Sequence, residues 1–578
     1  MDQQLDQFRS ISLAVVGSGG VGAMTTGQML FQAAAKTGLY GMFTRSLGPQ
    51  IRGGEAAALL RLTTEPAAGI DDNYDLLVAI DWKNIERFAA ELPLTNKSII
   101  ISDPKGGEVP EVIAKSGAQI YELPLAATAR SVKGRVNMVV LGVVSTIIGL
   151  PAQALETVLR ETLDRKGEDA IQSSLVAVQE GRNIAESLPE TDCKIEIPAE
   201  VVGTRWVLSG NEAAGFGAIK AGIRFVAAYP ITPGTEVLEW MATSLRKVGG
   251  ALVQAEDELA SINMVIGGSY AGVPSLTATS GPGLALMTEG IGLAVAAEVP
   301  VVIVNVQRGG PSTGIPTKTE QSDLNIALYG LHGDAPHLVL AALDVSDCLF
   351  TTQWSVYLAE KLQTAAIVLS DQYIGQAKAA IDVPEDHPFK AERLIESEPA
   401  EDYLRYAVTP SGVSPMTIPG IPGGQYTADG LETNQKGLPS TQAEHHGEQM
   451  DKRLRKLTQE NYGDYWAEVS GEGKVAIITW GSTAGAVREA AKRLRHEGIN
   501  VKVIAVRLIS PAQPEKMAEA LEGVSRILVV EQNHSAQFCG FFRANYDLPQ
   551  KVESYNRPGP LIIRPGEIAD KIKEWGIK

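Results

Sequence analysis

Apolar runs recur along this chain, and each passes through a turn of Gly, Pro, Ser or Thr into a segment with helical periodicity. Between Phe225 and Arg308 the runs FVAAYP, LTATS and VPVVIVNVQ follow one another in this way. Runs that are apolar on both faces are typical of parallel strands covered by helices, with functional side chains at the strand ends. We therefore expect Thr232, Glu258 and Ser280 to form a functional site with Arg308.

The first 188 residues follow the same pattern. ISLAVVGSGGVGAMTTG predicts a strand, a glycine-rich turn and a helix, and YGMFT, DLLVAID, SIIISD and NMVVLGVV predict further strands up to Val144. Helical segments then run to Leu188. This order predicts a Rossmann-like domain at residues 1–188.

The rest of the chain divides at two polar segments rich in Pro and Gly or in charge. A strand AAIVLSD that ends at Asp371 closes a second α/β unit, and VAIITWGS, VKVIAVRLIS and RILVVEQN predict a third unit with a parallel sheet. The expected divisions are a linker at 189–203, a second domain at 204–382, a long connecting segment at 383–470 and a third domain at 471–578. The connecting segment ends in an amphipathic helix that begins near Gln449.

The glycine-rich turn GSGGVG, Gly17 to Gly22, leaves two interpretations open. It resembles the fingerprint of dinucleotide-binding folds, which also requires an acidic residue about 20 positions later. No Asp or Glu occurs from Ala23 to Gly54, which disfavours NAD. A structural turn or another phosphate-bearing ligand remains. Arg52, beside two glycines, either presents a cation to an anion or lies in a surface turn.

Composition excludes several classes of protein. The chain has 578 residues, 44% of them hydrophobic and 21% charged, which predicts compact α/β domains rather than disorder. A net charge of -17 opposes binding to nucleic acid or to an anionic membrane. Cys193, Cys348 and Cys539 are too far apart for a zinc site or an iron–sulfur cluster, and no signal peptide or membrane span is indicated. We expect a cytoplasmic protein.

Several motifs resemble one family. YPITPGTE (229–236), TSGPG (279–283) and NVQRGGPSTGIPT (305–317) together resemble the alpha subunit of 2-oxoacid:ferredoxin oxidoreductases. GSGGVG and IRGGE resemble the gamma subunit, and the segment with VEQN resembles a transketolase C-terminal domain. The chain thus looks like the fused gamma–alpha type found in 2-oxoglutarate:ferredoxin oxidoreductase. The resemblance implies three parallel-sheet α/β domains: Rossmann-like gamma, thiamine diphosphate pyrimidine-type and transketolase C-terminal-like.

The resemblance also implies an activity and its residues. The family oxidatively decarboxylates a 2-oxoacid to acyl-CoA and carbon dioxide with thiamine diphosphate and coenzyme A, and passes the electrons to ferredoxin. Glu258 would contact the aminopyrimidine ring, Thr232 would donate a hydrogen bond to the substrate, and Arg308 would face its carboxylate. The residues expected to bind the cofactor are Tyr229, Pro230, Ile231, Glu258, Ser280 and Gly281.

Each of these residues also has a structural explanation. Glu258 follows Glu256 and Asp257 at the start of a helix, where carboxylates favour the helix dipole, and Glu256 is the alternative choice. Thr232 precedes a helix and could be its N-cap. Arg308 could be an exposed arginine at a strand end, and turn geometry alone explains TSGPG.

Two motifs of the family are missing from this chain. We find no GDG signature for the diphosphate and no cysteine cluster. The resemblance therefore places Mg²⁺ and a [4Fe-4S] cluster on a partner beta subunit, in an α2β2 assembly that is active only when complete. Substrate choice stays open: the fused arrangement favours 2-oxoglutarate over pyruvate or branched-chain 2-oxoacids. A NAD-dependent dehydrogenase and a scaffold with an empty site are the competing hypotheses.

Overall fold

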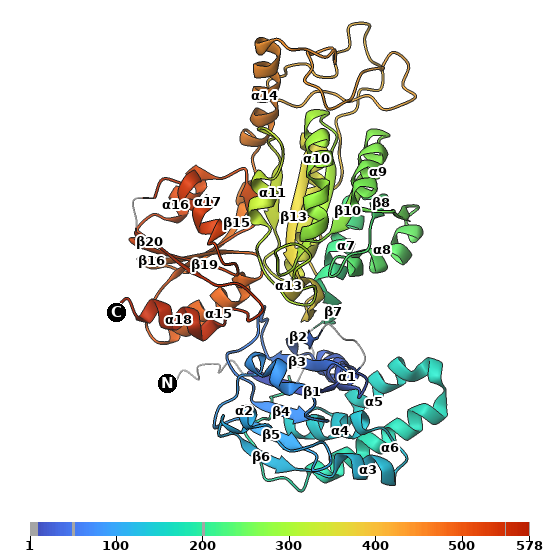
Figure 1. The fold of residues 1–578 in the computed structure, drawn as a ribbon, viewed down its shortest axis with the longest axis vertical. Coiled ribbons are helices and arrows are strands. Elements are labelled where there is room, and N and C mark those ends of the chain that lie inside the picture. Colours follow the sequence, from blue (N-terminus) through green and yellow to red (C-terminus); the bar gives the residue numbers. More distant parts are fainter. Residues whose placement is uncertain (1–9, 49–52, 199–202, 549–550, 577–578) are drawn as a thin grey trace. The chain divides into compact units, whose positions relative to one another are not determined.

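The computed structural model of the protein describes residues 10–48, 53–198, 203–548 and 551–576 (Figure 1). Contacts divide it into two compact units. The first holds the residues up to Leu208 together with Ala377–Glu385 and Arg564–Glu567, and the second holds Ser209–Gln376, Asp386–Ile563 and the residues from Ile568 onward. The second unit contains two of the three sheets, because β18 (Leu508–Ser510) of the C-terminal region pairs with β12 (Leu338–Ala341).

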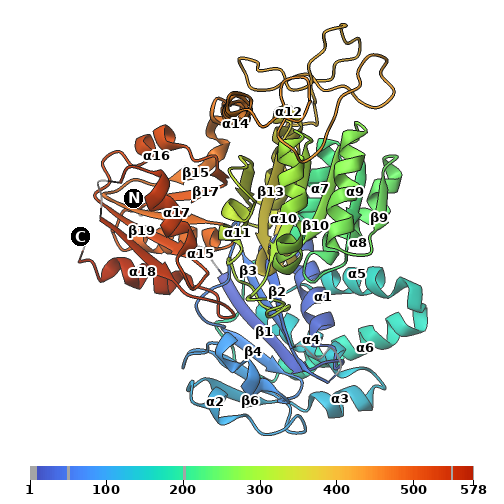
Figure 2. The same cartoon turned by 45° about the horizontal axis from the view of Figure 1, so that its top comes forward.

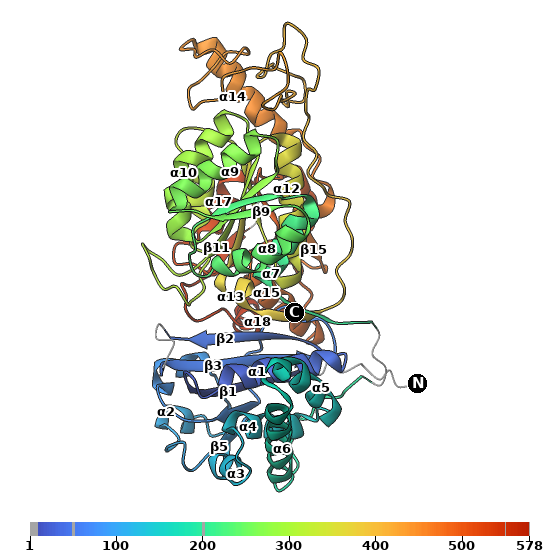
Figure 3. The ribbon, with the colours of Figure 1, turned by 90° about the vertical axis from the view of Figure 1, so that its right-hand side faces the viewer.

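The sheet of the first unit is mixed rather than parallel. Its strand order is β6-β5-β4-β1-β3-β2-β14-β7. Strands β1, β4, β5 and β6 are parallel, whereas β3 runs antiparallel to β1 and β2, and β14 runs antiparallel to β2. Strand β3 lies between β1 and β2 (Figure 3). The short connection between β2 and β3 allows only antiparallel pairing. The strands are β1 (Ser10–Ser18), β2 (Tyr40–Leu47), β3 (Glu55–Thr63), β4 (Leu76–Ala79), β5 (Ile99–Ser102), β6 (Gln119–Glu122), β7 (Trp206–Ser209) and β14 (Lys378–Ile381).

One predicted strand of this unit is wrong. NMVVLGVV lies in helix α4 (Val136–Ile148), which is buried on nearly all sides and packs against α6 (Glu168–Ala185). Gly142 and Gly181 let the two backbones meet, since a Cβ on Gly142 would lie 2.0 Å from the Val178 carbonyl oxygen. A fully apolar run carries no periodicity that separates a buried helix from a buried strand. The other helices are α1 (Ala23–Lys36), α2 (Glu111–Ala114), α3 (Leu125–Ser131) and α5 (Ala152–Leu163).

The seven-stranded sheet of the second unit has the predicted parallel core. Its order is β18-β12-β13-β11-β10-β8-β9, and only β18 is antiparallel to its neighbour. Its remaining strands are β8 (Phe225–Ala228), β9 (Ala251–Gln254), β10 (Ser275–Thr279), β11 (Val301–Gln307) and β13 (Ala365–Asp371). Its helices are α7 (Gly210–Ala221), α8 (Thr235–Lys247), α9 (Glu258–Tyr270), α10 (Gly281–Ala296), α11 (Leu324–Tyr329), α12 (Val345–Leu362) and α13 (Gln372–Gln376). Helices α9 and α10 lie side by side (Figure 2).

The third sheet has the order β15-β17-β16-β19-β20 and is parallel except for β15, which begins before residue 471. Its elements are β15 (Ala467–Ser470), β16 (Val475–Trp480), α15 (Thr483–His496), β17 (Lys502–Val506), α16 (Pro514–Ala520), β19 (Arg526–Glu531), α17 (Gln537–Asn545), β20 (Lys551–Asn556) and α18 (Pro565–Lys573). Among the described helices no single one is long and apolar enough to cross a membrane, and only the bent pair α3 and α4 passes by length and composition.

The connecting segment has no helix or strand from residue 386 to 442, and α14 (Ala443–Thr458) follows it (Figure 1). Buried Glu298, just after the end of α10, binds both the connecting segment and α14. Glu298 accepts hydrogen bonds from Lys452 Nζ at 2.8 Å and Lys456 Nζ at 3.2 Å, and Arg405 Nη2 donates to its carbonyl oxygen at 2.8 Å. Removing one partner of such a buried ion pair would leave an uncompensated charge and strongly destabilise the protein. These contacts therefore attach the segment firmly.

Candidate functional site

The strand ends of the seven-stranded sheet form a cleft of about 720 Å³. Strand β11 ends at Gln307 and presents Arg308, and α10 begins beside it at Gly281. The segment after β19 of the third sheet contributes His534. The side chains of the cleft that carry charge or a hydroxyl group are Arg308, Ser312, Thr313, Glu320, Ser322, Asp323 and His534.

Arg308 is buried, with 7% of its surface exposed. Its Nη1 donates to the Thr232 carbonyl at 2.6 Å and its Nη2 to the Thr313 carbonyl at 2.7 Å. Its Nε has no partner, and no ion pair joins it to another described residue. Burial lowers the pKa of Arg308, and Asp323 acts in the opposite direction. A desolvated cation that bonds only to neutral oxygens favours an anionic ligand.

Thr232 lies on the surface, next to this guanidinium. The structure does not make it the N-cap of α8, because that position is Gly234, which has no side-chain cap. The Thr232 hydroxyl makes no hydrogen bond to any described residue, so it is available to a ligand. The preceding residues Tyr229, Pro230 and Ile231 are exposed or half-buried at the same turn.

Glu258 is the first residue of α9 and is 6% exposed, whereas Glu256 is exposed. Capping of α9 falls to Asp257, whose Oδ1 accepts from the Ala260 backbone N–H at 2.7 Å. Within the described chain the Glu258 carboxylate has no hydrogen bond. A Cβ on Gly283 would lie 2.8 Å from Glu258 Cγ and 2.1 Å from Thr279 Oγ1. The structure therefore favours Glu258 over Glu256 as a ligand-binding carboxylate.

The turn TSGPG and the strand before it each contain a hydroxyl group without a partner among the described residues. Ser280 is the N-cap of α10, yet its side chain makes no capping bond and its buried Oγ has no partner among the described residues. Thr277 Oγ1, in β10, is also buried without a partner. Buried polar atoms are normally hydrogen-bonded, so such orphans indicate a missing ligand or water. The Ser280 hydroxyl and the free carboxylate of Glu258 have the chemistry to bond an aminopyrimidine ring, which both donates and accepts hydrogen bonds.

Asp323 is a residue of the cleft that the sequence did not single out. Asn305 Nδ2 donates to its Oδ2 at 2.9 Å, and its own backbone N–H donates to Gln307 Oε1 at 3.0 Å. Burial raises its pKa to about 6, although the Asn305 bond and Arg308 act in the opposite direction. An acid directly before α11 looks in sequence like an ordinary helix N-cap. Only its place after the QRGGPSTG loop could have marked it.

In the glycine-rich turn of the first unit, the side chain of Ser18 and the N–H groups of Ser18 and Gly19 already have partners. The Ser18 N–H and Oγ both donate to the Asp81 carboxylate, at 3.1 Å to Oδ1 and 2.8 Å to Oδ2, and the Gly19 N–H donates to the Gly54 carbonyl at 2.7 Å. A Cβ on Gly22 would lie 2.7 Å from Asn137. A carboxylate already bound there repels a phosphate, so the geometry favours a structural turn. Arg52 lies outside the described residues.

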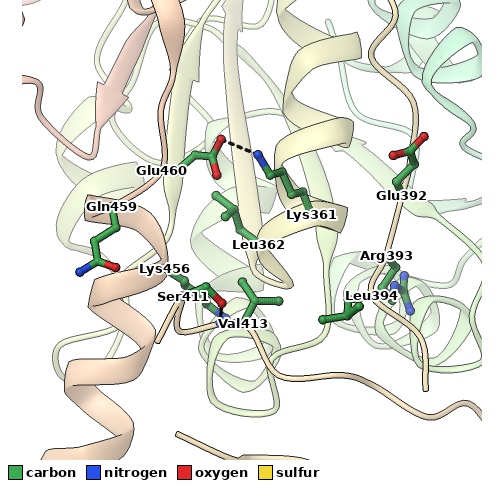
Figure 4. Close-up of a pocket in the computed structure, with 10 residues that line it drawn as sticks. All are labelled: Lys361, Leu362, Glu392, Arg393, Leu394, Ser411, Val413, Lys456, Gln459 and Glu460. Atoms are coloured by element: carbon green, nitrogen blue, oxygen red, sulfur yellow. Dashed lines mark hydrogen bonds and ion pairs between the residues drawn. The ribbon is translucent and has the colours of Figure 1, made fainter. Parts of the chain in front are cut away.

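A second cavity of about 490 Å³ lies between the end of α12 and α14 (Figure 4). Its cations already have carboxylate partners: Lys361 with Glu460 at 2.7 Å, Arg393 with Glu360 at 2.8 Å and Lys456 with Glu298 at 3.2 Å. The cavity therefore lacks the unpaired cation that distinguishes the cleft at Arg308.

Three family descriptions match this chain. "Pyruvate flavodoxin/ferredoxin oxidoreductase, thiamine diP-bdg" matches residues 216–452, "Pyruvate ferredoxin/flavodoxin oxidoreductase" matches 12–184, and "Transketolase, C-terminal domain" matches 464–544. The matches follow the three sheets and confirm the predicted α/β class with its pyrimidine-type and transketolase-like parts.

Whole proteins give the same result. The chain is 30% identical to the 2-oxoacid:ferredoxin oxidoreductase subunit alpha of Saccharolobus solfataricus, over 98% of this chain and 97% of that protein. It is 36% identical to the 2-oxoglutarate synthase subunit KorA of Methanothermobacter thermautotrophicus, over 64% of this chain and 98% of that one. The solved 2-oxoglutarate:ferredoxin oxidoreductase of Magnetococcus marinus, with 2-oxoglutarate, coenzyme A and succinyl-CoA bound, is similar with a TM-score of 0.91 and 36% identity, over 98% of this chain and 99% of that chain.

Proposed function

Because the chain belongs to the alpha subunits of the 2-oxoacid:ferredoxin oxidoreductases, we propose that it supplies half of a thiamine diphosphate site and binds the 2-oxoacid at Arg308. The chemistry that this cofactor supplies is an electron sink for the carbon that loses carbon dioxide. The protein supplies binding, orientation and proton transfer. The observation that carries the proposal is the buried Arg308 guanidinium, which has no anionic hydrogen-bond partner among the described residues.

Each residue at the site would have a separate task. Glu258 would form a hydrogen bond with a nitrogen of the pyrimidine ring, because its buried carboxylate has no other hydrogen-bond partner within the described chain. Arg308 would bind the carboxylate of the acid through its planar guanidinium. The hydroxyl of Thr232, beside Arg308, would donate to a substrate oxygen, and Ser280 would bond the ring. Tyr229, Pro230, Ile231 and Gly281 would shape the pocket around it.

We favour 2-oxoglutarate as the substrate. The fused arrangement of the chain and the names of its relatives support this choice, while pyruvate and branched-chain 2-oxoacids are the alternatives. The active enzyme would contain a beta subunit that carries the diphosphate site, Mg²⁺ and a [4Fe-4S] cluster, in an α2β2 assembly. Coenzyme A would take the acyl group and ferredoxin the electrons. The buried free thiols of Cys193, Cys348 and Cys539 fit the cytoplasm.

Coexpression with the beta chain tests this proposal. The purified complex should reduce a viologen dye only when a 2-oxoacid and coenzyme A are both present, and this chain alone should not. Parallel assays with 2-oxoglutarate, pyruvate and a branched-chain acid would identify the substrate by kcat/KM. Full turnover by the isolated chain would contradict the shared site, and an assembled but inactive complex would support the scaffold hypothesis.

A further inference from the structure

The cleft contains a cation and a carboxyl group that do not bond to each other. The two Nη atoms of Arg308 donate to the carbonyl oxygens of Thr232 and Thr313. The Asp323 carboxylate instead accepts from Asn305. The two side chains line the same cavity, and Arg308 is the cation that acts on Asp323. An incoming anion can therefore bind Arg308 without first displacing Asp323 from it.

The position of Asp323 is fixed by its neighbours. A Cβ on Gly281 would lie 2.7 Å from either of its carboxylate oxygens, so the group lies directly against the first residue of α10. Asn305 Nδ2 holds Oδ2, while Oδ1 has no hydrogen bond within the described chain. This fixed carboxylate borders the space that an Arg308 ligand would occupy.

An anionic substrate would bring a second negative charge into this space. Two carboxylates beside one cation repel each other strongly where water is excluded. One of them is then stabilised by a proton, and a 2-oxoacid carboxylate is the weaker base because its keto group withdraws electrons. Asp323 is the carboxyl group that can accept the proton.

We propose that Asp323 is a positioning residue that takes up one proton when the 2-oxoacid carboxylate binds at Arg308, which makes room for the substrate's charge. This inference rests on the proposed role of Arg308. The proton comes from solvent, forms an O–H bond on Asp323, and returns to solvent when the site empties. No bond of the substrate is made or broken in this step.

The surroundings of Asp323 support the exchange. Arg308 acts directly on Asp323, Asp323 acts on Glu320, and His534, which lines the same cleft, acts on Glu320. Glu320 and Asp323 are like charges in one cleft, and burial together with the neighbouring Asp323 raises the pKa of Glu320, so a further negative charge there is unfavourable. The pKa of Asp323, raised by burial to about 6, leaves the group mostly ionised at neutral pH but easily protonated.

Proton uptake by Asp323 predicts that substrate binding depends on pH. In the wild-type complex KM should rise roughly tenfold or more between pH 6 and pH 8, since ionised Asp323 must be protonated first. Asp323→Asn should show a flat KM over this range, and Asp323→Glu should restore the slope. A flat profile in the wild type would overturn the inference.

Calorimetry of the assembled complex measures the proton directly. The ligand is 2-hydroxyglutarate, which has no keto carbon to decarboxylate, and it is titrated at pH 7.5 in buffers with different ionisation enthalpies. We expect uptake of about one proton per site in the wild type and in Glu320→Gln, and almost none in Asp323→Asn. Binding without proton uptake in the wild type would overturn the role of Asp323 alone.

The same titration separates the two proposals. Arg308→Ala should abolish binding of 2-hydroxyglutarate. If this variant binds the ligand as tightly as the wild type, Arg308 does not hold the carboxylate, and the proposed function fails at its first step together with the proton exchange.

Discussion

Two strand–turn–helix junctions of this protein look alike in sequence and differ in chemistry. GSGGVG joins β1 to α1, and TSGPG joins β10 to α10. In the first, the donors of Ser18 and Gly19 are bonded to Asp81 and Gly54. In the second, the Ser280 hydroxyl is buried without a partner among the described residues.

The glycines of the two turns also serve different ends. Gly22 brings α1 close to Asn137 of α4, so its missing side chain serves packing. Gly281 and Gly283 make room for the carboxylates of Asp323 and Glu258. Their missing side chains therefore leave space for groups of the candidate site. The two turns therefore differ in whether the serine hydroxyl has a partner, and for this reason we propose a ligand only at the second turn.

The largest effect is expected at Glu258. Glu258→Gln should lower kcat by about 10²–10⁴-fold, because the amide cannot exchange a proton with the cofactor ring. The alpha–beta complex should stay intact by size-exclusion chromatography. Glu256→Gln is the matched control and should stay within a few-fold of the wild type; equal losses in both variants would place the proton transfer elsewhere.

Arg308→Lys should reduce activity less than Glu258→Gln does. An ammonium group keeps the charge but cannot bond to both carbonyl oxygens and a carboxylate in one plane, so kcat/KM for the 2-oxoacid should fall by roughly 30- to 100-fold. Steady-state kinetics measure this. Arg246→Lys, on the exposed end of α8, is the control. A variant with unchanged kcat/KM would show that charge alone is sufficient.

At the structural turn the expected change is in stability. Asp81→Asn weakens the bonds from Ser18 and should lower the free energy of unfolding by about 1–2 kcal/mol, without a change in kcat. Chemical denaturation followed by circular dichroism measures the first quantity and the dye assay the second. A selective loss of kcat in a folded variant would indicate that this turn also binds a ligand.

Asp323 gives a smaller, pH-dependent effect. Its pKa is raised to about 6, so its contribution to stability is fully present below the ordinary pKa of an aspartate, about 4, and is lost as the pH rises through 6. Asp323→Asn, which cannot ionise, should therefore be more stable than the wild type by ~1–2 kcal/mol at pH 7.5 and no more stable at pH 3.5. Thermal denaturation at the two pH values checks the sign.

No effect at all is expected from NADH. A fluorescence titration of the chain should show no saturable binding, because Asp81 accepts hydrogen bonds from both donors of Ser18 in the GSGGVG turn and no acidic residue lies from Ala23 to Gly54 to bind the ribose. Tight binding would reverse the comparison and revive the dehydrogenase hypothesis.

Local patterns predicted much of the fold. The strands of the seven-stranded sheet alternate with helices in sequence, so its parallel core followed from periodicity. The mixed order of the first sheet could not be predicted in this way. Strands β3 and β14 form antiparallel pairs there, and no local pattern distinguishes such pairs from parallel ones. Helix α4 was mistaken for a strand because its apolar residues face the core on every side.

The sequence predicted those candidate site residues that their own position in the chain marks. Arg308 and Glu258 stand at a strand end and a helix start, and burial then separated Glu258 from Glu256. Asp323 was missed because its environment comes from Gly281, Asn305 and Arg308, which are distant in sequence. Asp81 is likewise 63 positions from the Ser18 it binds.

The buried cluster at Glu298 has a consequence for how the chain can be cut. Arg405 and the two lysines of α14 attach both ends of the connecting segment to the end of α10. The exposed glycines Gly420 and Gly423 lie between these attachments, and a Cβ on Gly420 would meet no neighbour within 4 Å. New termini opened there would leave both halves of the segment attached, so the protein offers a site for circular permutation or for expression as two complementing fragments.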